Sequence, residues 1–124
     1  MALGQILVIE DDAQVAQMLH AVVVDSGYDC LCAANGLKAL RLVRTYRPDV
    51  ILLDHYLPGM TGVELLVLLR REYPEIPVVM VTANADQQTA LKMLDLGAFD
   101  YVRKPFEVDV LERILQAAMV YRAR

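Results

Sequence analysis

The chain has 124 residues, of which 56% are hydrophobic and 23% charged, and its formal net charge is −4. This length suits one domain over residues 1–124, and the apolar content excludes a disordered chain. No basic stripe, no membrane-length apolar run and no secretion signal occur in the sequence, so we expect a cytoplasmic protein that binds neither nucleic acid nor membrane directly.

Short apolar runs alternate five times with longer amphipathic stretches, which predicts five strands and five helices. In chain order the predicted elements are a strand at 6–9, a helix at 13–26, a strand at 28–33, a helix at 37–46, a strand at 49–53, a helix at 61–73, a strand at 78–81, a helix at 86–96, a strand at 99–102 and a helix at 108–122. Asp12 is the predicted N-cap of the first helix, and Thr61 with Glu64 has capping-box spacing.

Repeated βα units with short loops predict an α/β fold, because right-handed crossovers place helices on both faces of a parallel sheet. The continuous apolar run at 50–53 is typical of a strand that is covered on both faces. Five units favour the doubly wound (βα)5 flavodoxin-like fold with strand order 2-1-3-4-5.

Reactive side chains follow four of the predicted strands. Glu10, Asp11 and Asp12 follow the first strand, Asp54 the third, Thr82 the fourth, and Arg103, Lys104 and Pro105 the fifth. In the order 2-1-3-4-5 these four strands are neighbours, and the crevice of such sheets lies at their carboxyl ends. We therefore expect these side chains to lie close together.

Three carboxylates, from Glu10, Asp11 and Asp54, would then lie within a few ångströms. Each close pair repels by about 4 kcal/mol at an effective dielectric near 20, so the cluster must be protonated, hydrated and splayed apart, or neutralised by a cation. Oxygen ligands favour Mg²⁺, with Mn²⁺ as a substitute. Lys104 adds a positive charge and Thr82 a hydroxyl donor, and the whole set suits phosphoryl transfer to a carboxylate.

Four segments carry a resemblance to a known family. They are I-L-V-I-E-D-D (6–12), D-V-I-L-L-D-H-Y-L-P-G-M-T-G (49–62), V-V-M-V-T-A (78–83) and G-A-F-D-Y-V-R-K-P-F (97–106). In this order and at these separations they resemble the receiver domain of bacterial two-component response regulators. The resemblance extends from about residue 5 to residue 122.

The resemblance implies a signalling phosphoacceptor rather than a turnover enzyme. It implies that Asp54 accepts a phosphoryl group from a sensor histidine kinase or a histidine phosphotransfer domain. It implies that Glu10, Asp11, Asp54 and the backbone carbonyl of Tyr56 bind a metal ion, and that Lys104 and Thr82 contact the phosphoryl group. Thr82 and Tyr101 would act as switch residues, and Tyr56 and Asn84 would tune the rate of dephosphorylation. The resemblance also implies a cis peptide bond before Pro105.

The resemblance also implies two contact surfaces. The face formed by residues 86–122 would bind an effector domain or a second receiver, and the first helix would dock the histidine donor. That helix has six apolar residues, which are Val15, Met18, Leu19, Val22, Val23 and Val24. The residues alone leave open whether all six are core or some form the docking surface.

Two other functions fit the site less well. A phosphatase of the haloacid dehalogenase type has a second acid two residues after its nucleophile, and Tyr56 stands there. A receiver-like binding module without phosphorylation would not need Asp54, Asp11, Thr82 and Lys104 together.

The cysteines and histidines carry no motif. Cys30 and Cys32 lack C-x-x-C spacing and are interpreted as small apolar residues on one face of a strand. His20 is predicted on a helix surface, and His55 is predicted to pack or face solvent.

Overall fold

The computed structural model describes residues 2–83 and 86–122. Strands and helices alternate along these residues. The elements are β1 (Gln5–Ile9), α1 (Ala13–Asp25), β2 (Asp29–Ala33), α2 (Gly36–Tyr46), β3 (Val50–Asp54), α3 (Gly62–Glu72), β4 (Val78–Thr82), α4 (Gln87–Asp95), β5 (Asp100–Arg103) and α5 (Val108–Arg122).

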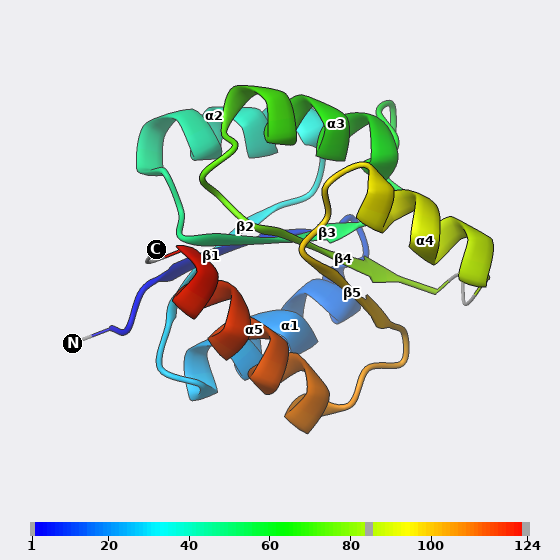
Figure 1. Cartoon of the computed structure of the whole chain (residues 1–124). Helices are drawn as coiled ribbons and strands as arrows, with labels where there is room; N and C mark the ends of the chain where they lie inside the picture. The colour runs from blue at the N-terminus through cyan, green and yellow to red at the C-terminus, as the bar shows by residue number, and fades with distance from the viewer. Residues whose placement is uncertain (1, 84–85, 123–124) are drawn as a thin grey trace.

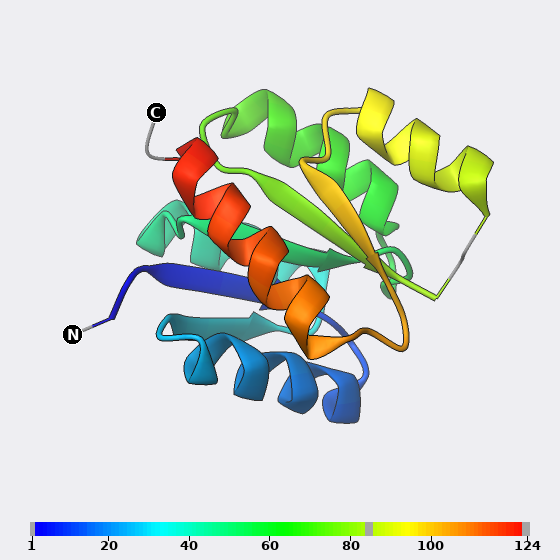
Figure 2. The same ribbon diagram turned by 60° about the horizontal axis from the view of Figure 1, so that its bottom comes forward.

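The strands form one parallel sheet in the order β2-β1-β3-β4-β5, as the sequence predicted. Helices α2, α3 and α4 cover one face, and α1 and α5 lie side by side on the other (Figures 1 and 2). Among the described residues, no helix has both the length and the apolar content that a membrane crossing requires.

Alternating side chains of the strands build two apolar layers. In β1, Leu7 and Ile9 pack with the α2 and α3 side, whereas Ile6 and Val8 pack with the α1 and α5 side. Every residue of β3 and β4 is buried, which explains why these strands appear in the sequence as continuous apolar runs.

Strand ends differ slightly from the predicted bounds. Asp54 and Thr82 are the last residues of β3 and β4 rather than the first residues of the loops, since Asp54 is in register with Val81, and Thr82 with Arg103. Ladder pairing therefore fixes the backbone of both residues, and both side chains are buried.

Side-chain caps mark the starts of α1 and α3, and therefore the ends of the loops that follow β1 and β3. The Asp12 carboxylate accepts hydrogen bonds from the backbone N–H groups of Gln14 and Val15 at 2.9 and 3.3 Å. The Thr61 hydroxyl accepts from the Glu64 N–H at 3.1 Å and donates to the Glu64 carboxylate. Both predicted caps are confirmed, although the Glu64 side chain bonds the cap hydroxyl instead of the cap backbone.

Gly62 brings the start of α3 against the end of β3. Its N–H donates to the His55 carbonyl at 2.8 Å. A Cβ atom at this position would collide with the backbone of Asp54 and His55. The absence of a side chain at Gly62 therefore permits the close approach that holds the loop after Asp54 in place.

Helix α1 has a wider apolar surface than the core uses. Leu19, Val22 and Val23 are buried, but Met18 is 57% exposed and Val24 46% exposed. The interpretation that all six apolar residues of this helix are core is therefore wrong.

Candidate functional site

An acidic cluster lies at the carboxyl ends of β1 and β3. One carboxylate oxygen from each of Glu10, Asp11 and Asp54 lies within 4.8 Å of the others. Glu10 and Asp54 are buried, whereas Asp11 is exposed. The strand order thus brings together three acids that come from two separate parts of the sequence.

Lys104 bridges the two buried acids. From the end of β5, its ammonium donates to the Glu10 carboxylate at 2.6 Å and to the Asp54 carboxylate at 3.1 Å. The cluster is therefore neutralised in part by a cation of the chain itself. The sequence placed Lys104 at this pocket but did not predict its bond to Glu10.

The pocket also shifts the pKa values of the buried groups. Burial, followed by the hydrogen bond to Asp54, raises the pKa of Glu10 to about 7, and Lys104 only partly opposes this. Burial lowers the pKa of Lys104, but its bonds to Glu10 and Asp54 outweigh that effect and the pKa is raised. The pocket therefore favours the charged form of Lys104 and disfavours the charged form of Glu10. Of the three alternatives for relieving the repulsion, the structure shows neutralisation in part by a cation, the Lys104 ammonium.

The donor set fits a hard divalent cation. Carboxylate oxygens are the ligands that Mg²⁺ prefers, and the exposed Asp11 leaves the cluster open to solvent for the water molecules that Mg²⁺ retains. Lys104 bonds an oxygen of Glu10 and an oxygen of Asp54. Binding of a cation by these acids would therefore compete with both of its ion pairs. A metal contact of the Tyr56 carbonyl stays a prediction.

The Thr82 hydroxyl is next to a side chain whose position the sequence did not predict. The His55 Nδ1 atom lies 3.5 Å from the Thr82 hydroxyl oxygen, and the His55 ring stacks on the Tyr56 ring with centroids 4.5 Å apart. Thr82 itself is fully buried, whereas Tyr56 is 60% exposed. His55 thus connects Thr82 with the aromatic residue at the mouth of the site. Spacing in the sequence could not reveal this, because it depends on the side-chain conformation of His55.

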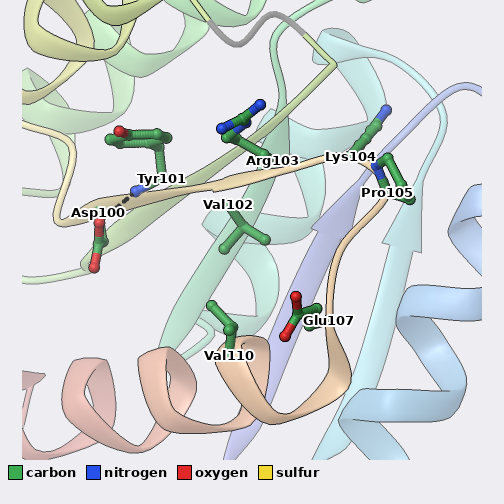
Figure 3. Close-up of a pocket in the computed structure, with 8 residues that line it drawn as sticks. All are labelled: Asp100, Tyr101, Val102, Arg103, Lys104, Pro105, Glu107 and Val110. Carbon is green, nitrogen blue, oxygen red and sulfur yellow. Dashed lines mark hydrogen bonds between the residues drawn. The ribbon is translucent and has the colours of Figure 1, made fainter.

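Tyr101 lies half-buried on the edge strand β5, with its ring in the apolar layer on the α4 side. Tyr101 and Arg103 project from one side of the strand and Val102 from the other (Figure 3). A hollow runs along this edge from Asp100 to Val110 and includes Lys104. Tyr101 and Lys104, which bonds to Glu10 and Asp54 of the acidic cluster, therefore lie on the same short segment. The bond between Lys104 and Pro105 is cis, and Asn84 lies outside the described residues.

Comparisons with known proteins agree with this geometry. The family model of the response regulator receiver domain matches residues 6–116. Regulatory protein AtoC of Escherichia coli (strain K12) is 40% identical over 118 residues, which cover 95% of this chain and 26% of AtoC. DNA-binding response regulator MtrA of Mycobacterium tuberculosis (strain ATCC 25618 / H37Rv) is 43% identical over 103 residues, which cover 83% of this chain and 45% of MtrA.

A solved structure extends the agreement to three dimensions. The receiver domain of the Francisella response regulator 1452 superposes with a TM-score of 0.86 at 32% identity, with 97% of this chain and 98% of that one covered. The chain spans less than half the length of AtoC or MtrA. Since the family model covers most of the chain and the sheet has the order of its structural relatives, the chain belongs to the response regulator receiver domains of two-component systems.

Proposed function

We propose that Asp54 accepts a phosphoryl group from a histidine of a sensor kinase or a phosphotransfer domain, with Mg²⁺ held by Glu10, Asp11, Asp54 and the Tyr56 carbonyl. One observation carries the proposal. Asp54 is 4% exposed, and its carboxylate lies within 4.8 Å of the Glu10 and Asp11 oxygens and 3.1 Å from the Lys104 ammonium. The carboxylate proposed as the nucleophile, the acid pair proposed to bind the metal and the Lys104 ammonium thus share one pocket.

The residues divide the chemistry among them. An Asp54 oxygen forms the bond to phosphorus while the phosphorus–nitrogen bond to the donor histidine breaks, and the histidine takes up a proton. A bound divalent cation would neutralise charge on the phosphoryl oxygens. Lys104 would leave its bond to Asp54 for a phosphoryl oxygen, and Thr82 would donate its hydroxyl to another.

Receiver domains act with histidine kinases and effector domains, and we place this chain in that role. The proposal treats it as a signalling phosphoacceptor in the cytoplasm rather than as a turnover enzyme. AtoC and MtrA are regulators of greater length, and MtrA is described as DNA-binding. With a net charge of −4 and no basic stripe, this chain is proposed not to contact DNA itself.

Incubation with acetyl phosphate tests the proposal directly. With Mg²⁺ present, the intact mass should rise by one phosphoryl group, and peptide mapping after borohydride reduction should locate it at Asp54. Without Mg²⁺ the mass should not change. A phosphoryl group on any other residue would contradict the assignment of Asp54.

Tyr56→Asn is expected to shorten the lifetime of the phosphorylated protein. The aromatic ring should shield phosphorus from an in-line water molecule, and its stacking on His55 holds it beside the site. Asn84 belongs to the same proposal as the second tuning position. Loss of the phosphoryl group is measured by mass spectrometry over time, with Tyr46→Asn on α2 as a control, since Tyr46 is similarly exposed. An unchanged rate in Tyr56→Asn would remove the shielding role.

Met18→Glu is expected to slow transfer from a histidine donor on the order of tenfold or more, as for the loss of one buried apolar contact. Met18 lines an apolar cavity with Val15, Lys104, Pro105 and Phe106, next to the acidic cluster. We propose that the histidine donor docks there. Transfer from the donor is compared with labelling by acetyl phosphate, which should be unaffected. Val24→Glu is the matched control, because Val24 is also exposed but lies in the last turn of α1 and does not line this cavity. Equal slowing with both donors would refute the docking.

Phosphorylation is expected to change the Thr82 and Tyr101 side chains together. The added charge should draw the Thr82 hydroxyl inward, and the half-buried Tyr101 ring would then enter the vacated space. The face of residues 86–122, which carries Tyr101, would change with it and bind an effector domain or a second receiver. NMR spectra with and without beryllofluoride and Mg²⁺ report both side chains. Identical rotamers in the two states would refute the coupled switch.

A further inference from the structure

The two cysteines form a pair that the phosphorylation chemistry does not use. Cys30 and Cys32 lie on the outer strand β2 and point to the same face of the sheet, as predicted. Their sulfur atoms are 4.0 Å apart. Cys30 is half-buried against the apolar layer on the α1 side, whereas Cys32 is exposed. Cys32 therefore does not serve as a packing residue.

Strand geometry opposes a disulfide between the two sulfurs. Residues two apart in a parallel strand have Cα atoms about 6.6 Å apart, near the upper end of the range that disulfides allow, and their Cβ atoms would have to approach to about 3.8 Å. Ladder pairing of Cys30 with Ile6 and of Cys32 with Val8 holds the backbone extended. The strand thus keeps the two cysteines as separate thiols and opposes a disulfide between them.

The same separation suits two bonds to one metal ion. Metal–thiolate bonds are about 2.3 Å long. With the two sulfurs 4.0 Å apart, an ion bound to both would have a sulfur–metal–sulfur angle of about 120°. No large movement of either side chain is needed to reach that angle. Because Cys32 is exposed, an ion has access from solvent, and a third coordination position would face water or a small external ligand.

The number of protein ligands available to the cysteine pair indicates which metal ion it can bind. In residues 2–83 and 86–122, Glu10, Asp11 and Asp54 form the single group of three or more His, Cys, Asp or Glu side chains close enough to share a metal. Among these residues the cysteine pair therefore has no third such partner, whereas Zn²⁺ sites in proteins have at least three protein ligands. Soft thiolate ligands favour Cu⁺, Zn²⁺ and iron–sulfur clusters. Iron–sulfur clusters are typically held by four cysteines, whereas Cu⁺ accepts two or three ligands.

We propose that Cys30 and Cys32 form a bidentate thiolate site for Cu⁺ on the outer strand of the sheet. Each thiol releases its proton to solvent as its sulfur–copper bond forms, and no electron is transferred.

Anaerobic titration of the whole chain with Cu⁺, in competition with a chromogenic chelator of known affinity, tests the proposal. We expect one Cu⁺ per monomeric chain and ultraviolet sulfur-to-copper absorption. Cys32→Ser should weaken binding by about 100-fold or more, because the second bond of a chelate benefits from a high effective concentration. Its exposed position makes Cys32→Ser a safe substitution for the fold, and Cys30→Ser should have the same effect.

The variant that lacks both cysteines measures binding by the six methionines of the chain. Equal affinity of the wild type and this double variant would overturn the proposal. One Cu⁺ shared between two chains, detected as dimerisation at half an equivalent, would also overturn it. So would formation of an intrachain disulfide under mild oxidation in a protein that binds no Cu⁺, because the argument from strand geometry would then be wrong.

Discussion

Asp54→Asn is expected to abolish phosphorylation, with a loss on the order of a thousandfold or more that leaves only background labelling. The amide cannot ionise, so the carboxylate that would attack phosphorus is gone. The fold should persist, because the amide oxygen still accepts the hydrogen bond that Lys104 gives to Asp54 at 3.1 Å. Intact-mass spectrometry after incubation with acetyl phosphate and Mg²⁺ measures the effect.

Asp12→Asn is the matched control for this substitution. It removes the same charge from a neighbouring acid, but Asn caps a helix as well as Asp does, so the bonds from Asp12 to the start of α1 should be retained. The control should be labelled like the wild type. Full labelling of Asp54→Asn, or loss of labelling in Asp12→Asn, would place the acceptor elsewhere.

Asp11→Asn is expected to weaken Mg²⁺ binding by at least about 10–100-fold. Loss of a group that only hydrogen-bonds a metal ligand already weakens metal binding by that factor, and Asp11 is proposed as a ligand itself. Asp11 is the exposed acid of the cluster, whereas Glu10 and Asp54 are partly satisfied by Lys104. Within residues 2–83 and 86–122, Asp11 therefore offers a carboxylate without an ion pair to break. The fold should be unaffected, because the Asp11 side chain is outside the core.

Isothermal calorimetry measures this affinity directly, and Asp12→Asn again serves as the control with the same change in charge. The rate of labelling by acetyl phosphate should fall in Asp11→Asn and recover at high Mg²⁺ concentration. Unchanged affinity would exclude Asp11 from the metal site, even if Asp54 proved to be the acceptor.

The sequence predicted the sheet order and the edge at which the site forms. Apolar runs such as that of β3 mark strands buried on both faces, and the order 2-1-3-4-5 then makes Glu10, Asp54, Thr82 and Lys104 neighbours. These predictions succeed because they depend on the spacing of apolar residues along each element and on the order of the strands. Many residues contribute to each of these features.

Side-chain placement was less predictable. The bond from Lys104 to Glu10, the stacking of His55 on Tyr56 and the exposure of Cys32 all depend on rotamers and local packing. The same is true of α1, where the apolar pattern did not distinguish the buried Leu19 from the exposed Met18. Such features require a three-dimensional structure, because the type of a residue does not determine which side chains it contacts.

The bridge from Lys104 to Glu10 joins residues that are 94 positions apart in the sequence. An unfolded chain keeps these groups distant, so it contains no comparable site for an ion. By mass action, a cation that binds only the native state stabilises it, by about 2.7 kcal/mol at a concentration 100 times its dissociation constant. Under the proposed ligation, the melting temperature of this domain would therefore rise with the Mg²⁺ concentration of the medium, before any phosphoryl donor is present.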